Sequence, residues 1–126
     1  MILTPANLDD LTRALKDASA RTEKVLAVRL DALKQILEHT PEDMTATVEA
    51  GLTLAELQVH LMKRGQWLPM DPPGADRLSI GELMSTNANG PRRYGYGTAR
   101  DYVIGMKVAL ADGRVIKAGG KVVKNV

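Results

Sequence analysis

The 126-residue sequence predicts one domain, or two small lobes with a shared core, built from both helices and strands. Residues 7–18 and 53–64 have the leucine spacing of amphipathic helices, whereas residues 45–50 alternate and are rich in β-formers. Hydrophobic residues make up 44% of the chain, which is enough for a core. Because the chain has no Phe and only one Trp, that core must be aliphatic.

The first predicted helix covers residues 7–18. Leu8, Leu11 and Leu15 recur at helical spacing, and Asn7 can cap the N-terminus. A short apolar run follows at residues 24–28 (KVLAV) and predicts a buried strand.

The next two segments differ in how well their patterns specify structure. Residues 30–39 fit either a helix or a strand that runs on into Thr40-Pro41. Residues 45–50 (TATVEA) predict a strand that ends at Gly51.

The clearest predicted helix covers residues 53–64. Thr53 and Glu56 have the spacing of a capping box, and Gly65 is a fitting stop. The apolar stripe of this helix consists of Leu54, Leu57 and Leu61.

The second half of the chain is rich in turns, since ten of the eleven glycines lie from Gly65 onward. Residues 102–111 and 114–118 predict two strands, and Asp112-Gly113 between them is a strong hairpin signal. Gly119-Gly120 then breaks the second strand.

Residues 68–101 combine many small, backbone-permissive residues with short hydrogen-bonding side chains, which suggests a backbone-lined site for a flat or phosphorylated ligand. Within this segment Ser79 and Glu82 repeat the capping-box spacing and predict a short helix over residues 80–85. An anion could bind at the start of that helix. The donors would be those of Ser79, Ile80 and Gly81. Local spacing alone favours a plain capped turn.

Composition argues against several classes of function. The net charge is only +2 and Arg92-Arg93 is the nearest approach to a basic patch, so nucleic-acid binding is not expected. The absence of cysteine excludes disulfides, thiolate metal sites and cysteine catalysis. No signal-peptide pattern and no membrane-spanning apolar run is present, so we expect a cytoplasmic protein.

No catalytic group can be identified from the residues. The dinucleotide fingerprint, the P-loop and the nucleophile-elbow motif are all absent. His39 and His60 have no ligand-spaced companion, so both are expected to be ordinary surface or boundary residues, and no metal site is predicted. A binding surface without catalytic side chains is expected where a cofactor carries the chemistry.

Four segments, VEAGLTLAEL, GQWLPMDPP, SIGELMSTNANGPRRYGYGTARD and GGKVVKNV, occur in one order along the chain. In order and approximate spacing they resemble the FAD-binding domain of the vanillyl-alcohol oxidase / p-cresol methylhydroxylase superfamily. Within it they are similar to the flavin subunit of bacterial glycolate oxidase, among 2-hydroxyacid oxidases and dehydrogenases. The resemblance covers nearly everything from Pro41 onward, and it reverses the local preference for a plain turn at Ser79.

The resemblance implies an α+β fold in which two small α/β lobes, at about residues 1–40 and 41–126, grip an extended FAD. In such enzymes a small 2-hydroxyacid gives a hydride to the flavin, and a second acceptor reoxidises it. The implied partners are therefore FAD, a substrate such as glycolate in the full-length protein, and other oxidase subunits.

The cofactor-binding residues follow by carrying the resemblance over position by position. Pro72 and Pro73 would lie near the flavin end of the cofactor. Ser79, Ile80 and Gly81 would contact the pyrophosphate or flavin. Thr86, Asn87, Ala88, Asn89 and Gly90 would form a loop against the flavin and ribityl chain. Gly119, Gly120, Val122 and Val123 would approach from the later hairpin.

Three departures imply an incomplete domain. Val28 runs directly into Arg29-Leu30-Asp31, so the family's Gly-rich phosphate loop is absent. Gly81-Glu82 stands where the family has Gly-Gly, and residue 126 falls where the family continues into a substrate domain. We therefore expect weak or no turnover from this chain alone. The alternative is a non-catalytic, cofactor-free scaffold or subunit-assembly module.

Overall fold

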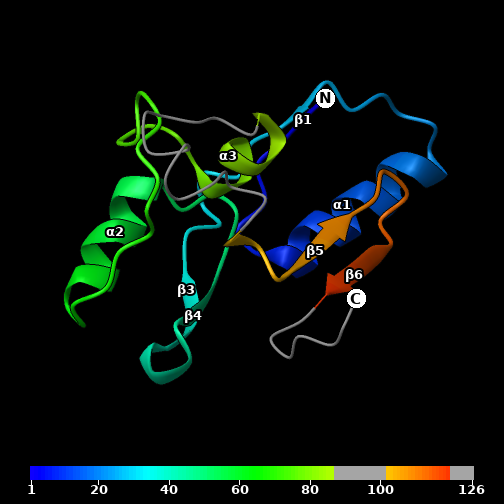
Figure 1. The fold of residues 1–126 in the computed structure, drawn as a ribbon. Helices are drawn as coiled ribbons and strands as arrows, with labels where there is room; N and C mark the ends of the chain where they lie inside the picture. The colour runs from blue at the N-terminus through cyan, green and yellow to red at the C-terminus, as the bar shows by residue number, and fades with distance from the viewer. Residues whose placement is uncertain (87–101, 120–126) are drawn as a thin grey trace. The chain divides into compact units, whose positions relative to one another are not determined.

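The computed structural model describes residues 1–86 and 102–119. The chain forms two compact units, Met1–Leu33 with Ile104–Val126, and Lys34–Val103 (Figure 1). The two lobes predicted at about residues 1–40 and 41–126 were defined by how they would bind FAD, and they stay a prediction. No helix in the described ranges is long and apolar enough to cross a membrane.

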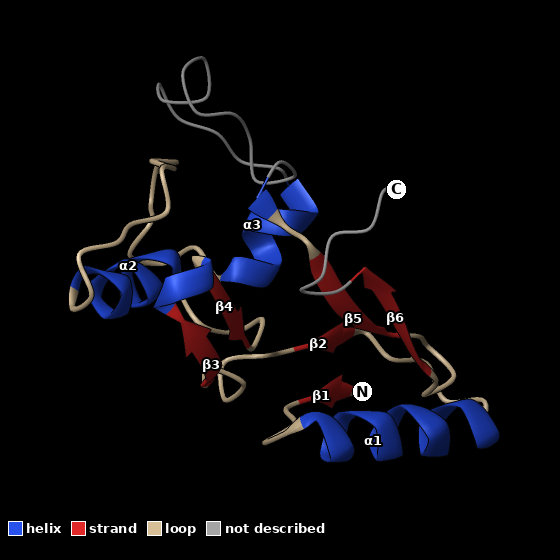
Figure 2. Ribbon diagram, turned by 60° about the horizontal axis from the view of Figure 1, so that its bottom comes forward, coloured by secondary structure: helices blue, strands red, loops and turns tan. Residues whose placement is uncertain are grey.

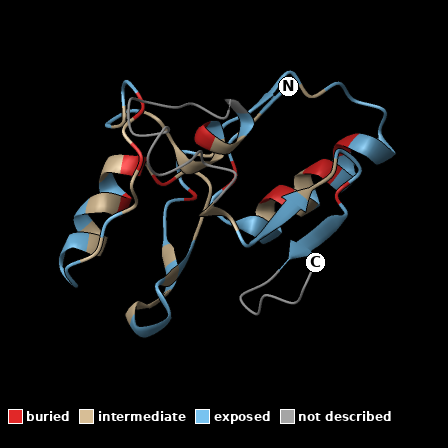
Figure 3. Cartoon of the chain, in the orientation of Figure 1, coloured by how far each residue is buried: buried red, intermediate tan, exposed pale blue. Residues whose placement is uncertain are grey.

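The first unit contains the helix predicted nearest the N-terminus. Helix α1 spans Leu8–Ala20, which confirms the prediction and extends it by two residues. Asn7 caps it as expected, because its side-chain oxygen accepts the N–H of Asp10 at 2.8 Å. The buried residues of α1 are Leu11, Leu15 and Ala18 (Figure 3).

Helix α1 connects two short parallel strands, β1 (Ile2–Leu3) and β2 (Ala27–Val28) (Figure 2). The prediction of a buried strand over residues 24–28 was wrong in length and in burial. Both residues of β2 are exposed, and Leu26 is 68% exposed. The reason is that β2 has one neighbouring strand of two residues, so the sheet covers little of its surface.

The first unit also contains the predicted hairpin, formed by antiparallel strands β5 (Gly105–Ala109) and β6 (Val115–Gly119). Its connection is a three-residue loop rather than a two-residue turn, because the N–H of Leu110 donates to the Arg114 carbonyl at 2.8 Å. Gly113 takes the last loop position with φ of +92°. The hairpin is thus confirmed, and glycine occupies the position that requires a positive φ. The first strand is shorter than the predicted range of residues 102–111, and β6 includes Gly119, which was predicted to break it.

The second unit begins with an antiparallel pair, β3 (Ile36–Thr40) and β4 (Thr45–Val48). The ambiguity over residues 30–39 is resolved in favour of a strand, which starts at Ile36. A 3-10 turn, Pro41–Asp43, joins the two strands. The predicted strand at residues 45–50 is confirmed, two residues shorter than expected.

Helix α2 spans Leu54–Met62 and has both predicted end signals. Its capping box is reciprocal, since the N–H of Glu56 donates to Thr53 Oγ1 at 3.1 Å and the N–H of Thr53 donates to Glu56 Oε1 at 3.2 Å. Gly65 follows the helix with φ of +70° and donates its N–H to the Met62 carbonyl at 3.0 Å.

Helix α3 spans Ile80–Thr86, one residue longer than predicted. It packs with α2 around a core of Leu54, Met70 and Leu83, which are buried (Figure 3). The core is aliphatic, as the composition predicted. The starts of the two helices are held together, because Thr53 and Ser79 form an antiparallel bridge.

Candidate cofactor site

The start of α3 contains Ser79, Ile80 and Gly81, three residues of the predicted FAD site. The Ser79 hydroxyl accepts the N–H of Glu82 at 3.1 Å and donates to Glu82 Oε1, also at 3.1 Å. The carboxylate of Glu82 is therefore drawn back onto the helix cap, and Ser79 acts as the predicted cap.

The backbone N–H groups of this first turn have protein acceptors. Ile80 donates to the Leu52 carbonyl at 2.8 Å, and Gly81 donates to the Ala50 carbonyl at 2.9 Å. These two groups are therefore not free in this structure, and their contact with a cofactor stays a prediction.

The small size of Gly81 has a packing role. A Cβ at Gly81 would lie 3.2 Å from both the Cβ and the carbonyl oxygen of Ala50, which is closer than ordinary contact. Glycine thus allows the start of α3 to approach the chain immediately after β4.

The remaining predicted site residues are placed only in part. Pro72 is buried beside core residue Met70, and Pro73 is exposed. Thr86 is the last residue of α3, and Gly119 is the last residue of β6. The other predicted positions lie outside the described residues: Asn87, Ala88, Asn89, Gly90, Gly120, Val122 and Val123.

The first unit has a cavity of about 310 Å³ at the carboxyl ends of its parallel strands. Thr4 and Pro5 line it directly after β1, and Arg29 and Asp31 line it after β2. Ligands of α/β units bind at this edge of a parallel sheet. The guanidinium of Arg29 lies 3.7 Å from Asp31, and both side chains are mostly exposed.

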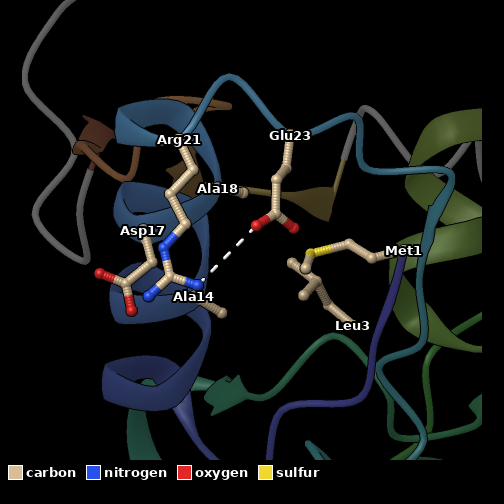
Figure 4. A pocket seen from close by; sticks show the side chains of 7 residues that line it. All are labelled: Met1, Leu3, Ala14, Asp17, Ala18, Arg21 and Glu23. Carbon is tan, nitrogen blue, oxygen red and sulfur yellow. Dashed lines mark ion pairs between the residues drawn. The ribbon is translucent and has the colours of Figure 1, made fainter.

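A second cavity in the first unit has a volume of about 170 Å³ (Figure 4). It is lined by residues of α1, by Met1 and Leu3 at β1, and by the segment between α1 and β2. An ion pair between Arg21 and Glu23, 3.8 Å long, lies along one side. Sites for cofactors usually enclose about 300–1,000 Å³, so this cavity is too small for a dinucleotide.

One polar cluster was missed by the sequence analysis. His39 Nδ1 of β3 lies 3.2 Å from His60 Nε2 of α2. Both residues are half-buried, as predicted for boundary positions, but their contact was not predicted. Nothing in the local sequence indicates this contact. The two residues are 21 positions apart, and the segment that contains His39 could be read as helix or strand.

Comparison with known proteins decides the family. The profile described as FAD binding domain matches residues 14–119. The chain belongs to this FAD-binding family. It is 32% identical to Glycolate oxidase subunit GlcD of Bacillus subtilis over 99% of this chain and 31% of that protein. It is 30% identical to a D-lactate dehydrogenase of Archaeoglobus fulgidus over 99% of this chain and 32% of that protein.

Solved structures confirm the fold of this FAD-binding chain. Alkyldihydroxyacetonephosphate synthase superposes with a TM-score of 0.81 at 17% identity, over 93% of this chain and 26% of that one. The predicted partial α+β FAD-binding domain is therefore confirmed, and FAD is its cofactor.

Two further facts follow from the alignments. The chain spans about a third of the length of these curated relatives. The alignment with GlcD covers 144 positions, and 99% of 126 residues is about 125, so about 19 aligned positions have no residue in this chain.

Proposed function

We propose that this chain is the FAD-binding portion of a flavin-dependent oxidoreductase that oxidises a small 2-hydroxyacid such as glycolate. The observation that carries the proposal is the 32% identity to Glycolate oxidase subunit GlcD along 99% of the chain. The similarity to a D-lactate dehydrogenase points to the same substrate class, since glycolate and lactate are both small 2-hydroxyacids. FAD, when bound, accepts the hydride from the hydroxyacid, and the protein binds and orients it.

The cofactor-binding residues of the proposal are those carried over from the resemblance. The starting point is Ser79, Ile80 and Gly81, whose backbone is fixed by bonds to Ala50 and Leu52. In the sequence, residues 87–90 follow α3 directly, and the resemblance assigns them to contacts with the flavin and ribityl chain.

In the alignment with GlcD, about 19 positions have no residue in this chain. We further propose that this gap falls between β2 and β3. No glycine occurs from Arg29 to Gln35, where the family's Gly-rich loop is expected. The 310 Å³ cavity at the carboxyl ends of β1 and β2 supports this location. Arg29 is then the cation available to a phosphate at that edge.

A second candidate function is a cofactor-free scaffold or an assembly module for other oxidase subunits. The specific observation in its favour is that Ile80 and Gly81 already donate to protein carbonyls, which adds to the missing phosphate loop. The Bacillus subtilis relative is named as a subunit of glycolate oxidase, which supports assembly of this chain with other subunits. A cytoplasmic location also stays a proposal, supported by the lack of cysteine, and cell fractionation tests it.

The test is a titration of the purified chain with FAD, followed by flavin fluorescence and the visible spectrum. We expect saturable binding that weakens at least tenfold on Asn87→Ala but not on Ser19→Ala, an exposed position on α1. Circular dichroism must show an intact fold in each variant. An intact fold without FAD binding would remove the flavin proposal and favour the assembly module.

Turnover is tested separately by dye reduction with glycolate and D-lactate. We expect no activity from this chain alone, because it spans a third of its relatives. Rapid glycolate-dependent reduction by the isolated chain would contradict that expectation.

A further inference from the structure

The contact between His39 and His60 is supported by a chain of hydrogen bonds that fixes one ring. The side-chain amide of Gln66 donates through Nε2 to the Pro41 carbonyl at 2.8 Å. This bond turns Gln66 Oε1 toward His39 Nε2, 3.0 Å away. Because an amide oxygen only accepts, His39 Nε2 must carry the hydrogen, and in the neutral ring Nδ1 has an open lone pair.

The open nitrogen of His39 faces a second ring nitrogen. His60 Nε2 lies 3.2 Å from His39 Nδ1, and the ring planes are tilted by 58° rather than stacked. One hydrogen now occupies this contact, donated by His60. A neutral imidazole can carry its hydrogen on the other ring nitrogen instead, which frees His60 Nε2 as a second ligand.

The spacing of the two nitrogens suits a shared ion. Zn–N bonds are about 2.0–2.1 Å long, and a tetrahedral angle between two of them separates the nitrogens by about 3.3–3.4 Å. The observed 3.2 Å is within tenths of an ångström of that value. An ion can therefore replace the hydrogen once each ring turns so that its lone pair points at the ion rather than at the other nitrogen.

We propose that His39 Nδ1 and His60 Nε2 bind a divalent transition-metal ion of the zinc and copper group. Imidazole nitrogen suits these ions, whereas Ca²⁺ and Mg²⁺ require oxygen ligands. In known metal sites the second ring nitrogen of a histidine ligand donates to an outer acceptor, which orients the ring. Gln66 Oε1 is that acceptor for His39 Nε2. No group of three or more His, Cys, Asp or Glu surrounds a common point in the described ranges, so water completes the coordination.

The site joins two elements of the second unit. His39 belongs to β3, His60 to α2 and Gln66 to the segment after α2. An ion held between them would stabilise the folded chain in proportion to its concentration, because binding to the folded state alone raises its stability. The inference is independent of the proposed oxidoreductase function, since it uses none of the predicted FAD-binding residues.

The experiment is Cu²⁺ binding to the whole chain, followed by pulsed electron paramagnetic resonance, with Zn²⁺ affinity measured by competition against a chromophoric chelator. The chain has two histidines and no cysteine, so every imidazole signal comes from this pair. We expect two imidazole ligands in the wild type. His39→Ala or His60→Ala should leave one imidazole and weaken Zn²⁺ binding at least tenfold.

A third variant tests the orienting role of Gln66. Loss of an outer hydrogen-bond partner typically weakens metal binding about 10–100-fold, and we expect Gln66→Ala to fall in that range. Gln35→Ala is the matched control, because the side chain of Gln35 is exposed and takes no part in the hydrogen bonds of His39 and Gln66. One imidazole in the wild type, or unchanged affinity in His60→Ala, would overturn the proposal. The wild-type spectrum decides the matter even if a variant fails to fold.

Discussion

Replacing Gly113 with alanine tests how the β5–β6 hairpin rests on α1. The position has φ of +92°, and an L-residue in a left-handed conformation is strained by about 1–2 kcal/mol. An added Cβ would also lie 2.8 Å from the Thr12 carbonyl oxygen and 3.0 Å from the Lys16 backbone nitrogen. Overpacking of this kind adds about 1–3 kcal/mol. A stiffer unfolded chain offsets about 0.4–1 kcal/mol of this, so we expect Gly113→Ala to lower the free energy of unfolding by about 1–4.6 kcal/mol.

Two glycines with open surroundings provide matched controls. Gly65 and Gly74 have φ of +70° and +73°, and a Cβ at either would meet nothing within 4 Å. Their substitution by alanine brings the strain alone, partly offset by about 0.4–1 kcal/mol from a stiffer unfolded chain. Gly65→Ala and Gly74→Ala should therefore lower stability by about 0–1.6 kcal/mol.

The assay is urea denaturation followed by circular dichroism, with amide hydrogen exchange at Leu110, whose N–H closes the hairpin loop. Combining Gly113→Ala with Lys16→Ala removes the lysine side chain but not the backbone atoms of α1. We expect no rescue in this double variant. If Gly113→Ala is no more destabilising than Gly65→Ala, or if Lys16→Ala restores stability, the hairpin does not rest on the helix backbone.

Three further predictions concern the second unit. Hydrogen bonds from the Thr53 hydroxyl and N–H hold the pKa of Glu56 below its ordinary value. Their contribution to folding stability is therefore present above the ordinary glutamate pKa and is lost as pH falls through the lowered pKa. Thr53→Val removes the hydroxyl and should make the urea midpoint less sensitive to acid. Ser79→Ala leaves the Glu82 N–H without its cap and should cost about 0.5–2 kcal/mol in urea unfolding. Leu83→Ala should cost about 2–5 kcal/mol, because the side chain is only 2% exposed.

The helices were predictable because their determinants are local. Asn7 caps α1 and Thr53 caps α2 through bonds to residues three positions away. The strands were less predictable because their partners are distant. β1 has only two residues, and it pairs with β2 in a register that joins Ile2 to Ala27, so no periodicity could show it.

The candidate site shows the same division between local and distant contacts. The spacing of Ser79 and Glu82 correctly predicted a cap. It could not show that the N–H of Gly81 is taken by Ala50, because that acceptor lies 31 positions earlier on another element. The approach of His60 to His39 depends likewise on how α2 packs against β3. Sequence patterns thus predicted the helices and most of the strands, whereas β1 and the availability of each polar group required the structure.

The proposed loss of the phosphate loop can be weighed against what the chain retains. Hydrogen bonds to a charged group contribute about 1.5–3 kcal/mol each, so losing two or three of them weakens FAD binding by several powers of ten. Arg29 restores little of this binding free energy. Its side chain is exposed and already paired with Asp31, and an exposed ion pair contributes about 0–1 kcal/mol. Inserting the corresponding segment of the Bacillus subtilis relative between Val28 and Ile36 should therefore raise FAD affinity by at least a hundredfold. A Ser/Asn insert of equal length is the control. Equal affinity with both inserts would mean that the flavin end dominates binding and that the gap lies elsewhere.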